Sequence, residues 1–218
     1  CLGVDVVAYD AAGSPVGGER GELVVRRPMP SMPVKFWNDP GDERYRASYF
    51  EMYPGVWRHG DWISFDDDGS CVVYGRSDAT LNRGGVRMGT GEFYGVLDTM
   101  PEIADSLVID TTSAAMPRGQ LIVLVQPAAG TAAEDLEMNV RDRLRSTLTP
   151  RHKPDHVIMV PALPHTLSGK KMEVPAQRIF TGEPVDKVLD ASSVDDPAAV
   201  ASLADAAAEW RRRTGLDA

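Results

Sequence analysis

The first third of the chain alternates short apolar runs with turn-forming residues, a pattern typical of antiparallel strands. The runs VDVVAY, GELVVR, WISF and CVVYG each fit a strand, and DDDGS between the last two fits a hairpin turn with glycine where φ is positive. We therefore predict a small antiparallel β unit over residues 4 to about 75. Residues 29–50 interrupt it with prolines, glycine and aromatics in no clean period, so this stretch is predicted to be a long excursion packed on a neighbour.

The pattern changes near residue 77. Residues 77–90 are polar and glycine-rich with few large apolar side chains, which is typical of a linker or of a loop with a hairpin. After them we predict helix, strand, strand, helix and strand in the stretches GEFYGVLDTM, SLVID, QLIVLVQP, AEDLEMNVRDRLRSTL and HVIMV. The expected fold class is α+β, with a small antiparallel β subdomain followed by a compact α+β domain.

The last segment predicts one amphipathic helix with both ends marked. Asp196 is a favourable N-cap, Pro197 follows at the first helical position, and Gly215 comes after the last turn. Residues on one stripe of this helix are apolar: Val200, Leu203, Ala207 and Trp210. Three arginines at 211–213 lie where the helix dipole favours cations, and we interpret them in this way and not as a nucleic-acid contact.

Charge and composition exclude several classes of function. The 218 residues include 32 acidic and 23 basic side chains, and the formal net charge of -9 makes nucleic-acid binding unexpected. No apolar run approaches the length of a membrane span and no signal pattern opens the chain, so a cytoplasmic protein without membrane partners is predicted. Cys1 and Cys71 form no C-x-x-C pair, and Cys71 is expected in a strand core. A start at Cys1, directly before a strand, predicts a piece of a longer chain.

The stretch LPHTLSGKKMEV holds two adjacent lysines in a turn-prone segment of this acidic chain. A phosphate-binding P-loop is excluded, because Pro164 stands where its first glycine belongs and Lys171 stands where a hydroxyl is required. Ser168 and Lys171 have the S-x-x-K spacing of serine acyl-enzymes, but Gly169 disfavours the helical turn that this chemistry needs, and the motifs SDN and KTG are absent. On this stretch alone, a solvated surface turn is the preferred interpretation.

Four motifs in order change that interpretation: WRHGDW, YGRSD, GGVRMGTGEFY and LPHTLSGKK. Over residues 57–171 they resemble the signatures of the adenylate-forming superfamily, which contains acyl-CoA synthetases, adenylation domains of peptide synthetases, and luciferases. The wording of the last two motifs is most similar to the branch that activates acetoacetate, and the branch that activates acetate is the next most similar.

The resemblance implies an AMP-forming acid-thiol ligase that uses ATP and CoA. Acetoacetate, ATP and CoA would give acetoacetyl-CoA, AMP and pyrophosphate through an acyl-adenylate, while a C-terminal domain alternates between two orientations. The phosphate loop and the adenine-binding segment of the superfamily are not found in this sequence. The large N-terminal domain is therefore expected to be a partner outside this chain, with the Mg²⁺ ligands in it and no metal residue here, and the chain alone is expected to be inactive.

Two alternatives stay open. The chain could belong to another short-chain acyl-CoA synthetase that acts on acetyl, propionyl or butyryl groups, or it could be a non-catalytic accessory domain that retains the motifs. The resemblance also implies four parts: residues 1–76 as the last β subdomain of the N-terminal adenylation domain, 77–90 as the hinge and glycine-rich loop, 91–184 as the mobile C-terminal α+β domain, and 185–218 as a C-terminal extension with a helix.

The resemblance assigns nucleotide contacts to three residues. Asp61 of HGDW would accept hydrogen bonds from both ribose hydroxyls, a task that suits the two oxygens of a carboxylate; the alternative is an aspartate at a strand-end turn. Arg76 of YGR would reach ribose or phosphate, or else form a surface salt bridge. Arg87 would contact phosphate in one of the two domain orientations.

The resemblance also implies a hinge and a CoA route. Asp78 matches the hinge position, where a few residues absorb a change in φ and ψ. Gly84 and Gly85 would line the route of the thiol, because backbone without Cβ lets the pantetheine arm pass closely; a hairpin turn is equally compatible with both glycines. Arg145 falls where related enzymes place an arginine that contacts CoA, but it also lies on a predicted helix near Asp142, and both interpretations stay open.

Lys170 is the catalytic candidate. By resemblance it would bridge the substrate carboxylate and the α-phosphate in the first half-reaction, where it would offset the charge that accumulates as carboxylate oxygen attacks phosphorus. A lysine suits this role as a compact cation on a long stem. Lys171 is then interpreted as a bystander.

Overall fold

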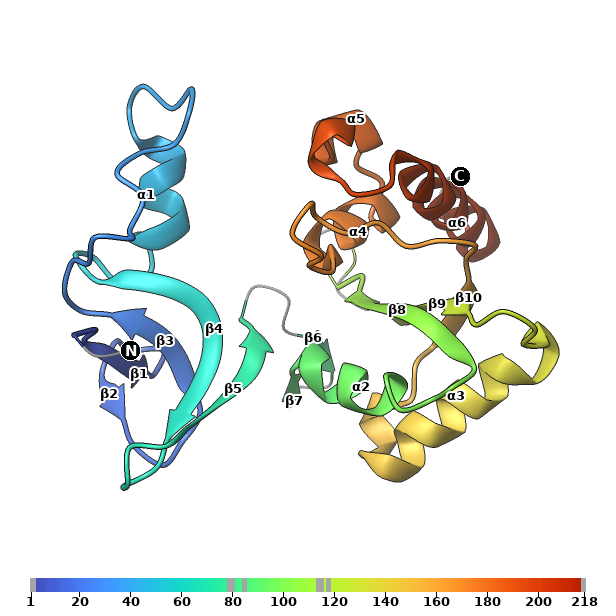
Figure 1. Cartoon of the computed structure of the whole chain (residues 1–218), viewed down its shortest axis with the longest axis horizontal. Coiled ribbons are helices and arrows are strands. Elements are labelled where there is room, and N and C mark those ends of the chain that lie inside the picture. The colour runs from blue at the N-terminus through green and yellow to red at the C-terminus, as the bar shows by residue number, and fades with distance from the viewer. Residues whose placement is uncertain (1–2, 78–80, 84–85, 113–115, 117–118, 217–218) are drawn as a thin grey trace. The chain divides into compact units, whose positions relative to one another are not determined.

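The computed structural model describes residues 3–77, 81–83, 86–112, 116 and 119–216. Contacts within the chain divide it into two compact units, Cys1–Asp78 and Ala79–Ala218 (Figure 1). Each unit is described by itself.

The first unit is a five-stranded antiparallel sheet in the order β2-β1-β3-β4-β5. Its strands are β1 (Val6–Tyr9), β2 (Pro15–Val16), β3 (Gly21–Val25), β4 (Trp57–Phe65) and β5 (Cys71–Arg76). The predicted hairpin turn joins β4 to β5, with Gly69 at φ 82°. The antiparallel β unit is thus confirmed. Cys71, however, is exposed, which corrects the expectation of a core thiol. It opens the edge strand β5, whose first three residues are all exposed.

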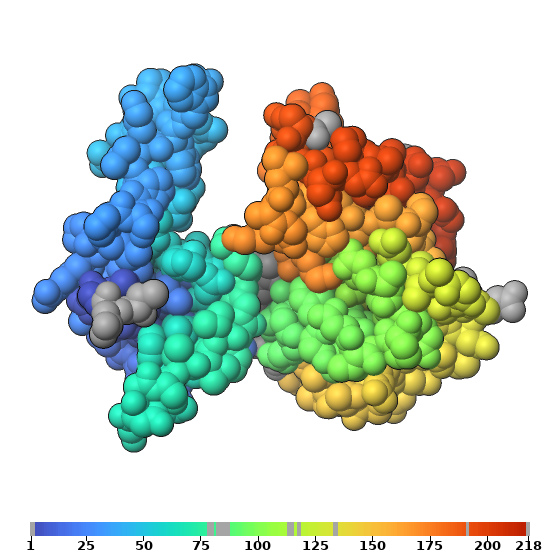
Figure 2. Space-filling model, in the orientation of Figure 1, coloured from blue at the N-terminus to red at the C-terminus, as the bar shows by residue number. Residues whose placement is uncertain are grey.

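The excursion between β3 and β4 contains a short helix, α1 (Glu43–Tyr49), that the sequence did not predict. Its aromatic side chains gather on β4: the Tyr49 ring stacks on Trp57 with centroids 3.7 Å apart, and Tyr45 and Phe50 meet the same ring edge-on. Such aromatic contacts stabilise the segment beyond the area they bury. The segment still stands out from its sheet (Figure 2), and the Trp37 side chain is 93% exposed.

The second unit is built around a three-stranded sheet in the order β10-β9-β8. Strands β8 (Ile103–Asp110) and β9 (Leu121–Pro127) are antiparallel, and β10 (His156–Met159) runs parallel to β9. A separate hairpin pairs β6 (Leu81–Arg83) with β7 (Val86–Met88). The helices are α2 (Thr90–Leu97), α3 (Ala133–Thr147), α4 (Glu173–Phe180), α5 (Val185–Val188) and α6 (Pro197–Thr214), with short 3-10 turns η1 (Pro150–His152) and η2 (Ala191–Ser193). The α+β fold class is confirmed.

Each face of this sheet carries its own core. Helices α2 and α3 cover one face of the sheet, and α4 and α6 cover the other (Figure 1). Successive residues of β9 point to opposite faces: Leu121, Val123 and Val125 belong to the core with α2 and α3, and Ile122 and Leu124 belong to the core with α4 and α6. A strand that is covered on both faces reads as a continuous apolar run, as LIVLV does here.

Helix α6 has the predicted ends. The Asp196 side chain accepts a hydrogen bond from the backbone N–H of Ala198 at 2.9 Å, and Gly215 takes the left-handed conformation at φ 72°. Its apolar stripe is buried, and Trp210 packs against Phe180 of α4 with ring centroids 5.5 Å apart. The helix therefore shares a core with β8, β9 and α4.

Candidate functional site

The lysine motif forms a tight turn between β10 and α4. Backbone N–H groups of Thr166 and Gly169 donate to the carbonyls of Lys170 and Thr166, at 3.0 and 2.7 Å. The Thr166 hydroxyl accepts from the Lys170 N–H at 3.0 Å. Gly169 lies at φ 76°, in the left-handed region that glycine enters without steric cost. Buried Leu163 and Met172 anchor the segment on either side.

The two lysines have different surroundings. Lys171 Nζ donates to Asp105 Oδ1 and to the Ser106 carbonyl, both at 2.6 Å, and lies 4.7 Å from the centroid of the Tyr94 ring. Lys170 is exposed, and within the described part of the chain its ammonium group has no partner. Lys171 is therefore engaged within the fold, and its expected role as a bystander in catalysis stays a prediction. Of the two lysines, Lys170 is the one whose ammonium stays accessible among the described residues.

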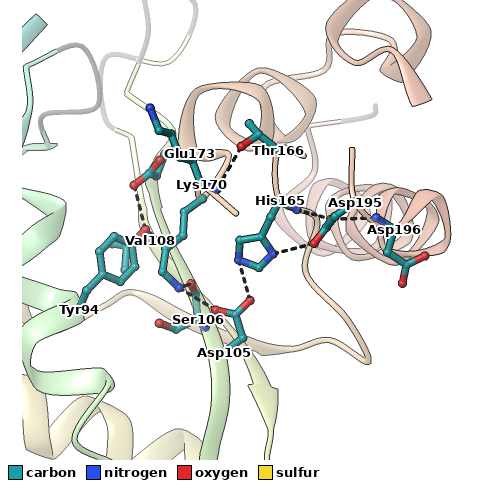
Figure 3. Close-up of polar contacts among 11 residues, drawn as sticks. Tyr94, Asp105, Ser106, Val108, His165, Thr166, Lys170, Glu173, Asp195 and Asp196 are labelled. Atoms are coloured by element: carbon teal, nitrogen blue, oxygen red, sulfur yellow. Dashed lines mark hydrogen bonds and ion pairs between the residues drawn. The ribbon is translucent and has the colours of Figure 1, made fainter. Parts of the chain in front are cut away.

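Three further side chains lie beside this turn and were not predicted as site residues from the sequence: Asp105, His165 and Asp195 (Figure 3). His165 Nε2 lies 3.3 Å from Asp105 Oδ2, and His165 Nδ1 lies 3.6 Å from Asp195 Oδ2. The backbone N–H of His165 donates to Asp195 Oδ1 at 2.9 Å, and this bond is the main reason why the pKa of Asp195 is lowered. Asp195 thus remains a charged acceptor. His165 lies inside the PHTL motif, but no sequence signal links it to Asp105 or Asp195.

Tyr94 completes the surroundings of Lys171 from α2. Its hydroxyl donates to Glu173 Oε1 at 3.1 Å and accepts from the Val108 N–H at 3.2 Å. Burial, with the neighbouring Glu173 charge, raises the pKa of Tyr94 far above its ordinary value. The phenol therefore keeps its proton, and its role is to hold neighbours in place.

In the first unit, two residues that the sequence predicts to bind nucleotide are neighbours across two strands. Asp61 on β4 and Arg76 on β5 are partners in the strand register. His59 Nδ1 contacts Asp61 Oδ2, and this hydrogen bond is the main cause of a raised pKa for His59. His59 stands two residues before Asp61 on the same strand, so the alternation of strand side chains could have indicated this contact.

A buried carboxylate lies at the end of the same unit. Glu22 is 1% exposed, and its Oε1 accepts a hydrogen bond from the Ser77 hydroxyl at 2.8 Å and lies 3.3 Å from Arg58 Nε. Arg58 Nη2 donates to the same hydroxyl at 3.0 Å, and the Ser77 N–H donates to the Gly60 carbonyl at 2.9 Å. Ser77 is therefore fastened to β3 and β4.

Arg145 lies on α3 and lines a surface hollow of about 690 Å³. Asp142 lines the same hollow, but among the described residues Arg145 forms no ion pair with it or with any other acid. The remaining lining residues are Thr99, Met100, Pro101, Glu102, Asn139, Arg143, Ser146 and Pro150. An unpaired guanidinium beside a hollow is available to an anionic ligand.

The other predicted site residues are not placed by the structure. Asp78, Gly84 and Gly85 lie outside the described residues. The backbone of Arg87 pairs with Asn82 in the β6–β7 hairpin, and its side chain is outside the description. Their roles stay predictions.

The described ranges contain no group of three or more His, Cys, Asp or Glu side chains that could hold a metal ion. The expected location of the Mg²⁺ ligands in another domain stays a prediction. The same ranges contain no helix with the length and hydropathy needed to cross a bilayer.

Comparison with known proteins places these features in context. Residues 95–170 match the AMP-binding enzyme C-terminal domain. The chain is 43% identical over 185 residues to the acetoacetyl-coenzyme A synthetase of Rhizobium meliloti (strain 1021), covering 84% of this chain and 28% of the relative. It is 38% identical over 187 residues to the acetoacetyl-CoA synthetase of Gallus gallus, covering 85% and 28%. The chain thus spans little more than a quarter of the length of these curated relatives.

The solved structures that the chain matches include an acetoacetyl-CoA synthetase as well. The chain matches the acetoacetyl-CoA synthetase from Streptomyces lividans with a TM-score of 0.85 and 45% identity, over 95% of this chain and 31% of that one. It also matches the amide bond synthetase McbA from Marinactinospora thermotolerans with a TM-score of 0.64 and 24% identity, over 82% of this chain and 34% of that one, which is a likeness of fold alone.

Proposed function

We propose that the chain is the C-terminal part of an AMP-forming ligase for acetoacetate and CoA. In support, residues 95–170 match the AMP-binding enzyme C-terminal domain, and the chain is similar to part of several acetoacetyl-CoA synthetases. In the first half-reaction, a carboxylate oxygen of acetoacetate attacks the α-phosphorus of ATP, and pyrophosphate leaves. In the second, the thiol of CoA attacks the acyl carbon of the adenylate, and AMP leaves with formation of acetoacetyl-CoA.

Lys170 serves the first half-reaction. Negative charge from the carboxylate and the α-phosphate converges as the new P–O bond forms, and an ammonium group delivered between them lowers the barrier. The observation that carries this proposal is the exposed Lys170 ammonium, which has no partner among the described residues and lies on a hydrogen-bonded turn beside a second lysine that is fully engaged.

Asp61 and Arg76 bind the nucleotide. The Asp61 carboxylate accepts hydrogen bonds from the ribose hydroxyls, and Arg76, its register partner, reaches ribose or phosphate. Arg87 contacts phosphate in one orientation of the second unit. ATP, CoA and acetoacetate are small-molecule substrates, and most of the acyl pocket and the Mg²⁺ ligands belong to a domain outside this chain.

CoA binding is assigned to the glycine-rich loop and to Arg145 on α3. Gly84 and Gly85 leave room for the pantetheine arm, and Arg145 pairs with a phosphate of CoA at its surface hollow. Asp78 lies at the hinge between the two orientations. The unpaired state of Arg145 among the described residues supports this assignment over a salt bridge with Asp142.

The test separates the two half-reactions in the full-length enzyme that we propose carries this chain. Lys170→Ala is expected to reduce acetoacetate-dependent exchange of pyrophosphate into ATP by about 100-fold or more. Thioester formation from preformed acetoacetyl-adenylate and CoA is expected to stay within about threefold. Survival of both activities would overturn the assignment. The 218-residue chain alone is expected to show no exchange of pyrophosphate into ATP. Such exchange would contradict the proposal that most of the active site belongs to a domain outside this chain.

A further inference from the structure

Asp105 connects the two ends of the lysine turn through one carboxylate. Its Oδ1 accepts the ammonium of Lys171 at 2.6 Å, and its Oδ2 lies 3.3 Å from His165 Nε2. His165 and Lys171 also face each other as an isolated antiparallel bridge. Both ends of the segment that carries Lys170 are therefore held by one residue of β8.

Lys171 is held in one place by groups of different kinds. Its ammonium has two oxygen acceptors, Asp105 Oδ1 and the Ser106 carbonyl, and the face of the Tyr94 ring as a third neighbour. The side chain is 24% exposed. Releasing this partly buried ammonium costs free energy, because it would lose two oxygen acceptors and Asp105 would lose its lysine partner.

The segment between α5 and α6 closes the cluster from another direction. The backbone N–H of His165 donates to Asp195 Oδ1 at 2.9 Å, and the Asp195 N–H donates to the His165 carbonyl at 3.0 Å. One residue further, Thr166 and Val194 form a second isolated bridge, and Val194 is buried. The first residue of the turn is thus fastened to residues that lie close to it only in the folded chain.

We propose that Lys171, Asp105 and Asp195 are positioning residues for Lys170. They hold the turn of residues 166–170 in one shape, so that the Lys170 ammonium arrives at a fixed place when adenylation takes place. This inference rests on the proposed role of Lys170. A small displacement of a catalytic group lowers the reaction rate strongly. Loosening the cluster therefore slows adenylation, which uses Lys170, and leaves thioester formation unchanged.

The kinetic test uses the full-length enzyme and measures both half-reactions. Lys171→Met is expected to lower the rate constant of adenylation about 10- to 100-fold. The KM for ATP, and thioester formation from preformed adenylate, should each change less than about threefold. Lys171→Arg should recover part of the loss, since a guanidinium keeps a cation against Asp105. Lys187→Met, which removes an exposed lysine of α5, is the matched control and should leave both rates unchanged.

A second measurement reads the turn directly in the 218-residue chain. Lys171→Met and Asp195→Ala are expected to speed amide hydrogen exchange at Gly169 and Lys170 at least about tenfold, without a change in β9. Asp195→Ala also serves if Lys171→Met fails to fold.

The outcomes separate this inference from the proposed function. If Lys170→Ala impairs adenylation but Lys171→Met and Asp195→Ala leave adenylation and exchange unchanged, the positioning role is wrong and the proposed function stands. If Lys171→Met lowers both half-reactions alike, Lys171 is merely structural and the inference is also overturned. If Lys170→Ala has no effect, the proposed function fails, while the exchange data still show whether the cluster holds the turn.

Discussion

Asp61 on β4 and Arg76 on β5 are opposite partners in the strand register, and a Cβ added to Gly60 would lie 3.2 Å from Arg76 Nη2. The guanidinium therefore lies against the backbone of Gly60, the residue before Asp61, whose carboxylate His59 contacts. Both residues belong to the nucleotide site proposed above.

Asp61→Asn is expected to raise the KM for ATP in the full-length enzyme about 10- to 100-fold, because hydrogen bonds to a charged acceptor contribute about 1.5–3 kcal/mol. Steady-state kinetics with varied ATP measures this. Asp67→Asn, in the exposed turn between β4 and β5, is the control. Equal KM values for the two variants would remove Asp61 from the nucleotide site.

His59 is expected to make stability depend on pH. Its pKa is raised above the ordinary 6.5, first by the hydrogen bond to Asp61, so folding favours the protonated ring. The resulting stabilisation is fully present below the ordinary pKa and is lost as the pH rises through the raised value. Thermal midpoints of wild type and His59→Gln should therefore converge as the pH increases above 6.5.

His156 provides the opposite sign as a control for that measurement. Burial is the main cause of its lowered pKa, so the folded chain disfavours its protonated form. His156→Gln should gain stability relative to wild type as the pH falls below the ordinary value of 6.5. A pH-independent difference for His59→Gln would show that its contact with Asp61 is not ionic.

Gly169→Ala is expected to destabilise the chain by about 1–2 kcal/mol, because a residue with Cβ is strained in the left-handed region. Nothing lies within 4 Å of a Cβ added at Gly169, so its φ of 76° alone carries the effect. Gly95→Ala on α2, where the added Cβ also meets nothing, should stabilise the helix by about 0.5–1 kcal/mol. Urea unfolding of both variants measures the contrast, and equal signs would contradict it.

Trp210→Ala is expected to cost about 3–5 kcal/mol of unfolding free energy, which is the usual range for removing a large aromatic side chain from a core. The side chain is 3% exposed and packs on Phe180. Leu216→Ala, at a position that is 44% exposed, should change the free energy by less than about 0.5 kcal/mol. A small effect of Trp210→Ala would mean that α6 is dispensable for the second unit.

Acetoacetate is expected to be the preferred acid of the full-length enzyme. Its kcat/KM should exceed those of acetate and butyrate by at least about tenfold, because a site built to hydrogen-bond a keto oxygen leaves polar groups unpaired around a plain acyl chain. Parallel assays with the three acids decide between this substrate and the other short-chain acids. Absence of turnover with any acid would favour the accessory-domain alternative.

Local patterns account for the features that the sequence predicted correctly. Alternation and turn residues located four strands of the first unit but not the two-residue β2, and the caps at Asp196 and Gly215 located α6. The continuous apolar run of β9 follows from a sheet covered on both faces. Each of these signals lies within a single strand, turn or helix. At that range, local backbone geometry decides which residue types fit.

The contacts that the sequence did not reveal join distant residues. Lys171 meets Asp105 across 66 positions, and Glu22 meets Ser77 across 55. No periodicity encodes such pairs, because folding of the whole unit brings them together. Exposure of Cys71 was missed for a related reason: the pattern of a strand does not state whether it lies at the edge of its sheet.

The anchoring of Ser77 extends the fixed part of the first unit one residue beyond β5. With its hydroxyl tied to Glu22 and Arg58 and its N–H tied to Gly60, this residue moves as part of the β subdomain. The hinge proposed at Asp78 would therefore begin directly after a residue that is fixed to its sheet.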